Sequence, residues 1–534
     1  MNKIVQSFWK AFFYTKRVGL RGLCRRLRRK FQPKIVQYGP WLGKHGVNER
    51  RKSWNRRQMQ AVEPIIDVLV LGNFVNAEKL RMGLKRQIWR PRGMHTDIKY
   101  CRGEYILLVS EDIKLEEDAL WQFYQAIENY GKPDMLYCDH DINYEEPVFK
   151  PDFNYDLLLS YNYIGNVIAV RRDVLERILA LKQEKVPLIY DIILRMIELG
   201  GEDIVHIAMP LYHSFIKRTE EKTIIKKIIG EHLARMGYNV TISEGVVKDT
   251  WHIQYEMDKE PLVSIIIPNK DHIDDLSKCL ESVFRQSYKK YEIIVVENNS
   301  EKADTFKYYE RLTQKYTNVR VLCWTKAFNY SLINNYGVRE AKGDYLLFLN
   351  NDIEFTGTEA IREMLGVCMR KDVGVVGAKL FYPDDSIQHA GVIVGYGGIA
   401  GHAFLGAQGS EDGYMNRLKC CQNYSAVTAA CMMVKREAFY KVRGFNGKLQ
   451  VAFNDVDFCL KVLSQGYRIV YTPFAEAYHY ESKTRGIENS YKKIKRFNQE
   501  VDMFRIKWKD IISTGDSAYN RNLSLYRWDF SLKY

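Results

Sequence analysis

Residues 343–352, Gly-Asp-Tyr-Leu-Leu-Phe-Leu-Asn-Asn-Asp, decide the fold class of this chain. Five apolar or aromatic residues follow a small polar turn and end on two amides and the carboxylate of Asp352. A short apolar run bounded in this way predicts a buried parallel strand. Ligands of open α/β sheets bind beyond the carboxyl ends of such strands, and a carboxylate there can hold Mg²⁺ or Mn²⁺ together with phosphate oxygens. The alternative for Asp352 is a cap of the following turn.

Two earlier apolar runs are expected to end at the same edge of the sheet. Residues 262–270, Leu-Val-Ser-Ile-Ile-Ile-Pro-Asn-Lys, form the first run, and apolar residues at helical spacing follow over 276–284. Residues 291–300 form the second run and end on Glu-Asn-Asn-Ser. Strand, helix and strand with short connections predict a parallel sheet wound by right-handed crossovers. The strand ends that should converge are those of Pro268 and Asn269, of Glu297 and Asn299, and of Asp352.

The motifs around these strands resemble those of the family 2 glycosyltransferases, which have the GT-A fold. The resemblance runs from residue 261 to about residue 486 and rests on VSIIIPNKD, IIVVENNS, FNYSLINNYGVREAKGDYLLFLNND, DVGVVGAKLFYPDDSIQHAG, AVTAACMMV and NDVDFCLKVLSQGYRIVYTPFAEAYHYESKTRG. Within that family the chain looks most like the rhamnosyltransferase-like enzymes of bacterial cell-surface polysaccharide synthesis. This implies an inverting sugar transfer, with rhamnose favoured, from a nucleotide diphosphate sugar to a hydroxyl of a lipid-linked or polymeric glycan.

The resemblance implies which residues bind the nucleotide sugar. Many relatives carry Asp where this chain has Glu297, so the acceptor carboxylate here is one methylene longer. Asn329 and Asn335 could instead be polar residues on a helix surface. The implied nucleotide-sugar contacts are Pro268, Asn269, Glu297, Asn299, Asn329, Asn335, Asn351 and Asp352.

A divalent cation and a general base are implied in the same way. Many GT-A enzymes present Asp-x-Asp, whereas this chain has Asn-Asn-Asp and offers Asp352 as the acidic ligand. His479 matches a late metal ligand of the family and suits Mn²⁺ better than Mg²⁺; a structural His is the alternative. Asp455 matches the general base, which must lie within hydrogen-bond reach of the acceptor hydroxyl. Helix capping explains one Asp of the pair Asp455 and Asp457 but not both. Acceptor contacts are expected of Gln388, His389 and Asp457.

A weaker copy of the pattern comes earlier in the chain. Residues 103–113 resemble 343–353, and in each half an Asp and a His follow 22 residues apart, Asp191 and His213 in the first and Asp457 and His479 in the second. Fewer strands precede residue 103 than precede residue 343, so the sequence predicts two tandem GT-A-like α/β domains with Rossmann-like, mostly parallel sheets, the first truncated and non-catalytic. A second active site stays open, because Asp112, Asp139, Asp141 and His213 remain.

The expected division of the chain follows from these motifs. It comprises a basic amphipathic segment (1–60), a degenerate GT-A-like domain (61–215), a linker with a helix and two strands (216–260), a catalytic domain (261–486) and a tail that packs on the catalytic domain (487–534). The ten cysteines contain no CxxC pair, which favours neither a zinc site nor a disulfide framework and suits a reducing cytosol.

The net charge of +15 is concentrated at the N-terminus. Residues 1–60 hold 17 Lys and Arg residues against one acidic residue. Apolar residues at helical spacing within 1–31 predict a basic amphipathic helix on an anionic membrane surface; a solvated tail or a docking helix for a protein is the alternative. No apolar run reaches the roughly 18 residues of a spanning helix. We therefore expect a cytoplasmic protein, peripheral at the inner face of the cell membrane.

Two other classes of function fit the sequence less well. A nucleic-acid-binding protein would spread its basic charge over a folded face, so no nucleic-acid partner is expected. A non-catalytic glycan-binding scaffold would not need Asp352, Asp455 and His479 together. A transferase with two active sites is the remaining alternative.

Overall fold

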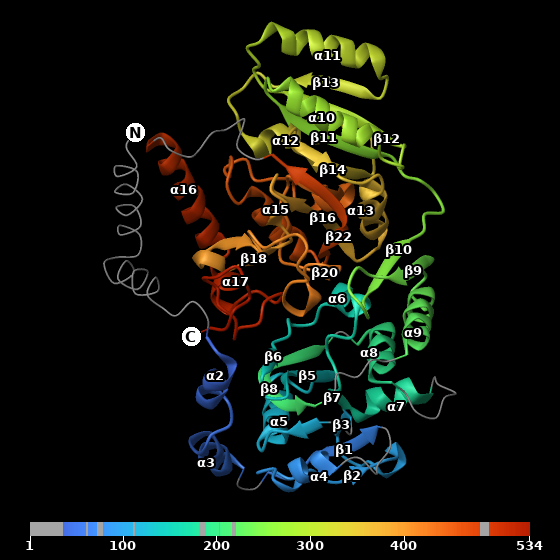
Figure 1. Ribbon diagram of the computed structural model, residues 1–534, viewed down its shortest axis with the longest axis vertical. Coiled ribbons are helices and arrows are strands. Elements are labelled where there is room, and N and C mark those ends of the chain that lie inside the picture. The colour runs from blue at the N-terminus through green and yellow to red at the C-terminus, as the bar shows by residue number, and fades with distance from the viewer. Residues whose placement is uncertain are drawn as a thin grey trace.

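A computed structural model describes residues 36–59, 62–71, 78–110, 113–180, 188–201, 203–215, 221–480 and 491–533 of the protein. The chain forms two α/β units, each built on its own sheet, at opposite ends of the long axis of the molecule (Figure 1). The predicted basic helix over residues 1–31 and the carboxylate of Asp112 lie outside the described residues.

The first unit begins with two helices and then alternates strands with helices. Its elements are α2 (Tyr38–His45), α3 (Glu49–Gln58), β1 (Ile66–Leu71), α4 (Glu78–Lys85), β2 (Met94–His95), η2 (Ile98–Tyr100), β3 (Tyr105–Ser110), β4 (Ile113–Leu115), α5 (Ala119–Asn129), β5 (Met135–Ile142), β6 (Glu146–Val148), α6 (Tyr155–Ser160), β7 (Val167–Arg171), α7 (Arg172–Ala180), α8 (Ile189–Glu198) and β8 (Ile204–Ser214).

The expected linker contains the predicted helix and two strands. These are α9 (Lys222–Arg235) and an antiparallel hairpin of β9 (Val240–Glu244) and β10 (Trp251–Tyr255). Helix α9 buries Ile225, Ile229 and Leu233 in the core of the first unit. The segment is therefore packed as part of that unit.

The second unit carries the motifs of the resemblance. Its elements are β11 (Val263–Asn269), α10 (Ile273–Phe284), β12 (Tyr291–Glu297), α11 (Ala303–Lys315), β13 (Val319–Cys323), α12 (Tyr330–Glu340), β14 (Tyr345–Leu349), β15 (Ile353–Phe355), α13 (Ala360–Met369), β16 (Val373–Phe381), β17 (Ile387–His389), β18 (Val392–Val394), η3 (Tyr396–Gly398), β19 (Ala400–His402), η4 (Tyr414–Asn416), β20 (Gln422–Asn423), β21 (Cys431–Lys435), α14 (Arg436–Lys441), α15 (Asn454–Leu463), β22 (Arg468–His479), α16 (Tyr491–Lys507) and α17 (Lys509–Thr514).

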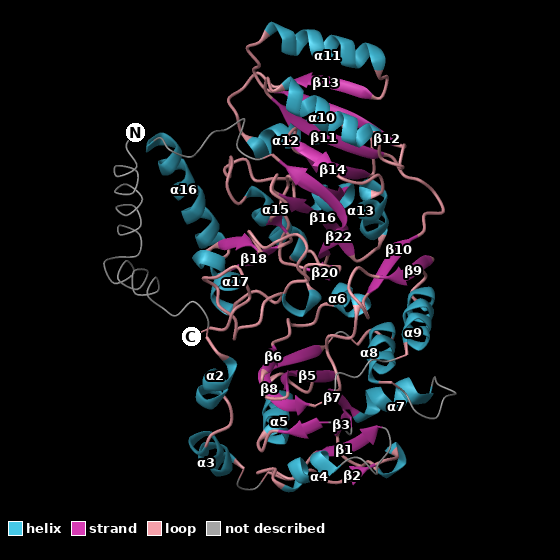
Figure 2. Ribbon diagram, in the orientation of Figure 1, coloured by secondary structure: helices cyan, strands magenta, loops and turns pink. Residues whose placement is uncertain are grey.

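The two sheets have equivalent topologies, as the sequence repeat predicts. The first runs β2-β1-β3-β7-β5-β8-β4 and the second β13-β12-β11-β14-β21-β16-β22-β15. The β1–β3 and β11–β14 pairs are parallel, the β3–β7 and β14–β21 pairs antiparallel, and the β5–β8 and β16–β22 pairs parallel again. Both units are thus α/β with mixed sheets (Figure 2). The first sheet is smaller at one edge. Its strand β2 has two residues, whereas the equivalent β12 has seven. No described strand of the first sheet corresponds to β13.

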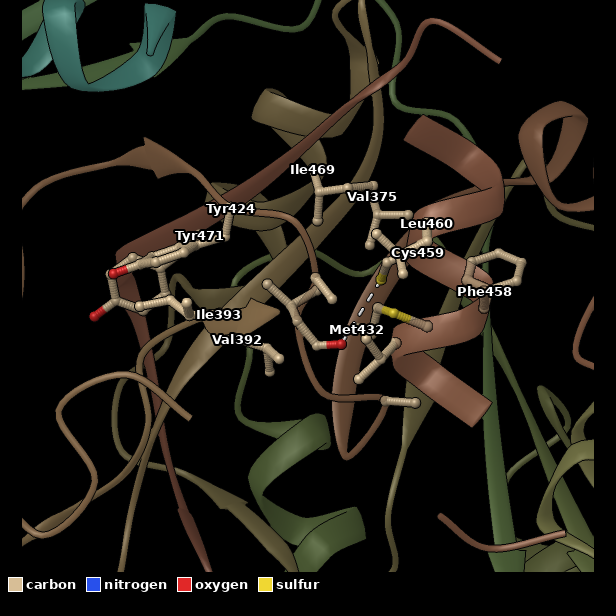
Figure 3. Close-up of a cluster of buried hydrophobic side chains, with 14 of the residues drawn as sticks. Val375, Val392, Ile393, Tyr424, Met432, Phe458, Cys459, Leu460, Ile469 and Tyr471 are labelled. Carbon is tan, nitrogen blue, oxygen red and sulfur yellow. Dashed lines mark hydrogen bonds between the residues drawn. The ribbon is translucent and has the colours of Figure 1, made fainter. Parts of the chain in front are cut away.

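Helix α15 is fixed on the second sheet by its apolar face. Phe458, Cys459 and Leu460 are buried among side chains of the sheet, including Met432 and Val375 (Figure 3). Full burial of a side chain of this size contributes about 2 kcal/mol. The N-terminus of the helix, which carries the predicted general base, is therefore held rigidly at the edge of the sheet.

The C-terminal segment after α17 lies between the two units (Figure 1). The Asn520 amide donates to both carboxylate oxygens of Asp139 in the first unit, at 2.9 and 3.0 Å. The carboxylate of Asp516 accepts hydrogen bonds from the Val394 N–H and the Ser425 hydroxyl in the second unit. The tail thus contacts the second unit and also joins it to the first.

Candidate active site

A cavity of about 250 Å³ opens beside the end of β14, where the sequence places the ligand-binding edge. Its walls come from seven separate segments of the second unit. Residues that line it include Asn350, Gln388, His402, Asn454, Asp455 and His479. Of the residues predicted from the sequence, Gln388, Asp455 and His479 are therefore brought together.

The hydrogen bonds of His479 define its tautomer. Its Nδ1 lies 2.6 Å from Oε1 of Gln388, which can only accept, so Nδ1 carries the proton. Its Nε2 faces the Asn350 amide at 3.3 Å and Oδ1 of Asp352 at 3.2 Å, and in the neutral ring this nitrogen carries the lone pair.

Asp352 and His479 together fit a divalent cation. An imidazole lone pair and a carboxylate oxygen at 3.2 Å repel each other unless a proton or a metal ion lies between them. Adjacent ligands about 2.1 Å from an octahedral cation lie about 3 Å apart. A ligating His usually donates its other N–H to an oxygen, as this ring does to Gln388.

Asp455 is held at the start of α15 with its carboxylate at the cavity. Oδ1 accepts from the Val456 N–H at 2.8 Å and Oδ2 from the Ala429 N–H at 3.3 Å. Phe453, two residues earlier, has a left-handed φ of 60° and turns the chain into the helix. This geometry leaves a half-buried carboxylate facing the space in which a substrate would bind.

The loop before Asp455 is clamped by a residue that the sequence motifs do not reveal. Glu500 of α16 accepts three consecutive backbone N–H groups, of Gln450 at 2.8 Å, Val451 at 3.2 Å and Ala452 at 3.0 Å. Burial raises the pKa of Glu500 even though these N–H groups favour its charged form. Helix α16 therefore sets the path of the chain into the cavity.

Asp457 faces away from the cavity, although an acceptor contact is expected of it. Its Oδ1 accepts from the Lys507 ammonium at 2.6 Å and from the Trp508 indole N–H at 2.9 Å. The side chain is fully buried. Asp457 thus anchors α16 to α15.

Asn329 and Asn335 bond to a loop of the protein itself. The Asn329 oxygen caps α12 by accepting from the Leu332 N–H, and its amide donates to the Gly447 carbonyl at 2.8 Å. Asn335 both donates to and accepts from the backbone of Phe445, at 2.9 and 3.0 Å. Both side chains hold the loop that leads to α15.

A row of hydrogen bonds joins the three strand ends at the predicted edge. Asn351 donates to Asn269 at 2.6 Å, Asn269 donates to the Tyr309 hydroxyl at 2.7 Å, and that hydroxyl donates to Glu297 at 2.7 Å. Glu297 also accepts from the Ser300 hydroxyl at 2.6 Å. The strand ends converge as expected, and Glu297 braces the loop that follows β12.

Two further predicted contacts lie at these strand ends but outside the cavity. Pro268 is half-buried in β11 opposite Val296. Asn299 has a left-handed φ of 55°, and its amide donates to the Lys326 carbonyl at 2.9 Å.

His389 is buried behind the cavity wall, and His402 occupies the wall in its place. His389 is fully buried, and its Nδ1 lies 2.9 Å from Nδ1 of His402. Asn454 also lines the cavity, and its Nδ2 is a buried donor without a hydrogen-bond partner among the described residues. His402 and Asn454 occur in the quoted motifs or near them, yet only the folded geometry brings them to the site.

The histidine of the first unit differs from His479 in register and contacts. Ile353 lies opposite His479, whereas the equivalent Ile113 lies opposite Ser214. His213 is thus one residue out of step, and adjacent residues of a strand face opposite sides. The expected equivalence of His213 and His479 is wrong for this reason.

Two of the acidic residues that remain in the first unit, Asp139 and Asp141, have partners within the described part of the protein. Asp139 bonds to His206 at 2.8 Å and to Asn520. His213 lies between Asp141 and Glu116, at 2.9 Å from each.

Residues 264–443 match the model of glycosyl transferase family 2. This part of the chain is a family 2 glycosyltransferase domain. We call residues 264–443 and the cavity beside them the transferase domain. Among the helices that the structure describes, none is both long and apolar enough to cross a bilayer.

Two relatives that match most of the chain are longer proteins. An uncharacterized protein, y4gI, from Sinorhizobium fredii is 40% identical over 455 residues, which are 82% of this chain and 50% of that protein. The O-antigen biosynthesis protein RfbC from Myxococcus xanthus is 33% identical over 405 residues, 72% of this chain and 31% of that protein. The chain thus spans half or less of these relatives. A mannosyltransferase from Pyrobaculum calidifontis, solved with GDP-Man and Mn²⁺, is 18% identical, with a TM-score of 0.35, over 47% of this chain and 64% of that one.

Proposed function

We propose that the protein is an inverting glycosyltransferase that moves a sugar from a nucleoside diphosphate donor to a hydroxyl of a cell-surface polysaccharide or lipid-linked glycan. The observation that carries the proposal is the single cavity lined by both Asp455 and His479, with Asp352 3.2 Å from the His479 ring. The O-antigen biosynthesis relative supports a polysaccharide acceptor. The resemblance to rhamnosyltransferase-like enzymes favours rhamnose as the sugar.

The reaction is one displacement at the anomeric carbon. The Asp455 carboxylate takes the proton of the acceptor hydroxyl, and the acceptor oxygen forms its bond to that carbon on the face opposite the diphosphate. The bond from the carbon to the diphosphate oxygen breaks, and its electron pair leaves with the nucleoside diphosphate. Asn454 would donate its unpartnered N–H to the bound sugar or diphosphate.

A divalent cation, Mn²⁺ or Mg²⁺, is proposed at Asp352 and His479. When bound it would neutralise charge on the leaving diphosphate. The protonated Nδ1 of His479 and its Gln388 partner support this role, because they turn the Nε2 lone pair toward Asp352.

The first unit is proposed to be non-catalytic. Asp139 and Asp141 are occupied by His206, His213 and the tail residue Asn520. Its sheet edge is also shorter, because β2 has two residues where β12 has seven. A second active site would require these internal contacts to open.

Membrane contact through residues 1–31 is proposed from the sequence pattern alone. Seven of the basic residues lie between positions 16 and 29, and each near an anionic surface contributes about 1 kcal/mol. Co-sedimentation with anionic vesicles, compared between the full chain and a variant without residues 1–31, tests this. Equal partitioning of the two proteins would contradict it.

The function is tested by thermal melting with a panel of donors, including dTDP-rhamnose and UDP-hexoses, with and without Mn²⁺. We expect one donor to raise Tm in a metal-dependent way in the wild type but not in Asp352→Ala. Transfer of that sugar to a polysaccharide acceptor should then be lost in Asp455→Asn. If no donor raises Tm and no sugar is transferred, the protein is a glycan-binding scaffold instead. If the Asp352→Ala, Asp455→Asn double variant still forms product, the first unit holds a second active site.

A further inference from the structure

Three side chains of metal-ligating type meet in the first unit, away from the transferase cavity. They are Asp67 of β1, His95 of β2 and Cys101, which ends the turn before β3. One donor atom from each lies within 4.8 Å of the others, and Oδ1 of Asp67 is 3.4 Å from Nε2 of His95.

The Asp67 carboxylate is oriented toward this cluster by the backbone. Its Oδ2 accepts from the N–H groups of Arg102 and Gly103, at 2.5 and 2.6 Å. Its Oδ1 is buried and has no hydrogen-bond partner among the described residues. The whole residue is 1% exposed. Leaving a buried carboxylate oxygen without a hydrogen bond costs roughly 1–3 kcal/mol or more, so a ligand that supplies positive charge would stabilise it.

The second sheet shows that the fold does not require these residue types. Ile66 and Val263 stand opposite the equivalent Tyr105 and Tyr345, so Asp67 corresponds to Ser264 by register. By the same registers, His95 in β2 corresponds to Ile294 in β12. Cys101 corresponds to Ala341, because each lies four residues before the equivalent tyrosine of β3 or β14. The first unit therefore has metal-ligating side chains at three positions where the second unit has a hydroxyl and two apolar side chains.

The backbone beside the cluster keeps the space between the ligands open. A Cβ atom on Gly93 would come within 2.4 Å of Nε2 of His95 and 3.1 Å of Oδ1 of Asp67. Any larger residue at position 93 would therefore displace the two donor atoms.

We propose that Asp67, His95 and Cys101 bind one Zn²⁺ ion, with water as the fourth ligand. Carboxylate, imidazole and thiolate are all ligands of Zn²⁺, and a thiolate excludes Mg²⁺ and Ca²⁺ in practice. Binding joins β1, β2 and the turn before β3 at the edge where the first sheet is shortest. Metal ligation thus replaces the strand pairing that β12 and β13 provide in the second sheet. The cysteine spacing could not reveal this site, because its ligands come from three segments and include one cysteine.

Binding must release the thiol proton. Zn²⁺ binds the thiolate, so the proton of the Cys101 thiol leaves to solvent as the bond from sulfur to zinc forms.

The test measures zinc content and Co²⁺ spectra of the full-length protein. We expect about one zinc ion per chain after dialysis, and a thiolate-to-cobalt charge-transfer band after exchange with Co²⁺. Cys101→Ala and His95→Ile place the residues of the second sheet at these positions, so both variants should fold. Each should bind Zn²⁺ at least about 10-fold more weakly, and the first should lose the band. Cys323→Ala, which removes an exposed thiol of the transferase domain, is the matched control and should keep it.

The variant Asp352→Ala tests the zinc site independently of the proposed transferase site. Zinc content and the cobalt band should be unchanged in it, whether or not the proposed transfer reaction is correct. A wild-type protein that retains no zinc and shows no thiolate band overturns the proposal and leaves an ion pair between His95 and Asp67. A band that persists in Cys101→Ala overturns it as well.

Discussion

His389 and His402 face each other through their Nδ1 atoms, 2.9 Å apart. Nε2 of His389 faces the backbone N–H groups of Gly391 at 3.4 Å and Thr428 at 3.3 Å, so it must hold a lone pair. The proton of His389 is then on Nδ1 and is donated to Nδ1 of His402. This leaves His402 neutral, with its own proton on Nε2. Burial, and then the neighbouring His402 and His479, keep the pKa of His389 well below its usual range.

His389→Ala should release the tautomer of His402. In the wild type, the N–H that His389 donates should hold His402 in the tautomer that carries its proton on Nε2. In the variant that donor is gone, so the Nδ1 tautomer of His402 should also be populated. ¹⁵N-edited NMR of the imidazole signals distinguishes the two tautomers. A wild-type His402 that carries its proton on Nδ1 would contradict the pairing.

Substitution of Asp455 should lower turnover, whereas substitution of Asp457 should lower the stability of the fold. Asp455→Asn should lower turnover by roughly 10²–10⁴-fold, because the amide cannot accept the hydroxyl proton, while donor binding is retained. Asp457→Asn should lower Tm, because Lys507 loses a charged partner, with turnover of the folded protein retained. Turnover and melting of the two variants, measured side by side, check the assignment; near-normal turnover in Asp455→Asn would refute it.

Gln388→Leu should weaken cation binding by about 10–100-fold. Without Oε1 of Gln388, nothing holds the His479 proton on Nδ1 and the Nε2 lone pair is no longer aimed at Asp352. Titration with Mn²⁺ by electron paramagnetic resonance measures the affinity. Gln254→Leu is a suitable control, since that amide bonds to Glu363 instead, and equal affinity in the two variants would remove Gln388 from the site.

His206 should make stability depend on pH. Burial disfavours its charged form, but the carboxylates of Asp139 and Asp152 outweigh this and raise its pKa above 6.5. The stabilisation is therefore complete below about pH 6.5 and is lost as pH rises through the folded-state pKa. The urea midpoint should fall between about pH 6 and pH 9 in the wild type. His206→Gln should be less stable by about 3 kcal/mol at the lower pH, because Asp139 stays buried without its cation, and should show a flatter profile.

Features that depend on a local pattern of residues, such as the strands of the sheet and the repeat of the fold, could be predicted from the sequence. Apolar runs that end on polar residues located β11, β12 and β14, and Asp352 and His479 were expected to share one site because of the resemblance. The repeat predicted a second α/β unit, since the glycine turn and apolar run over 103–113 preserve the same spacing.

Side-chain partners far apart in the chain could not be predicted. Asn335 looks like a polar helix residue in the sequence, and only folding brings its amide to Phe445, 110 residues away. Asp139 and Asn520 lie 381 residues apart. One residue of register places Ser214 rather than His213 opposite Ile113, and a pattern of spacing cannot detect such a shift.

The clamp of Glu500 on the loop before Asp455 has a consequence for how the protein can be divided. A fragment that ends at residue 486 would contain every motif of the family resemblance and still lack the carboxylate that orders three backbone amides beside the cavity. Family motifs alone therefore do not mark the end of the unit that holds this loop in place. A fragment made to assay the proposed transfer should extend through α16, because hydrogen bonds from beyond the motifs fix the path of the chain to Asp455.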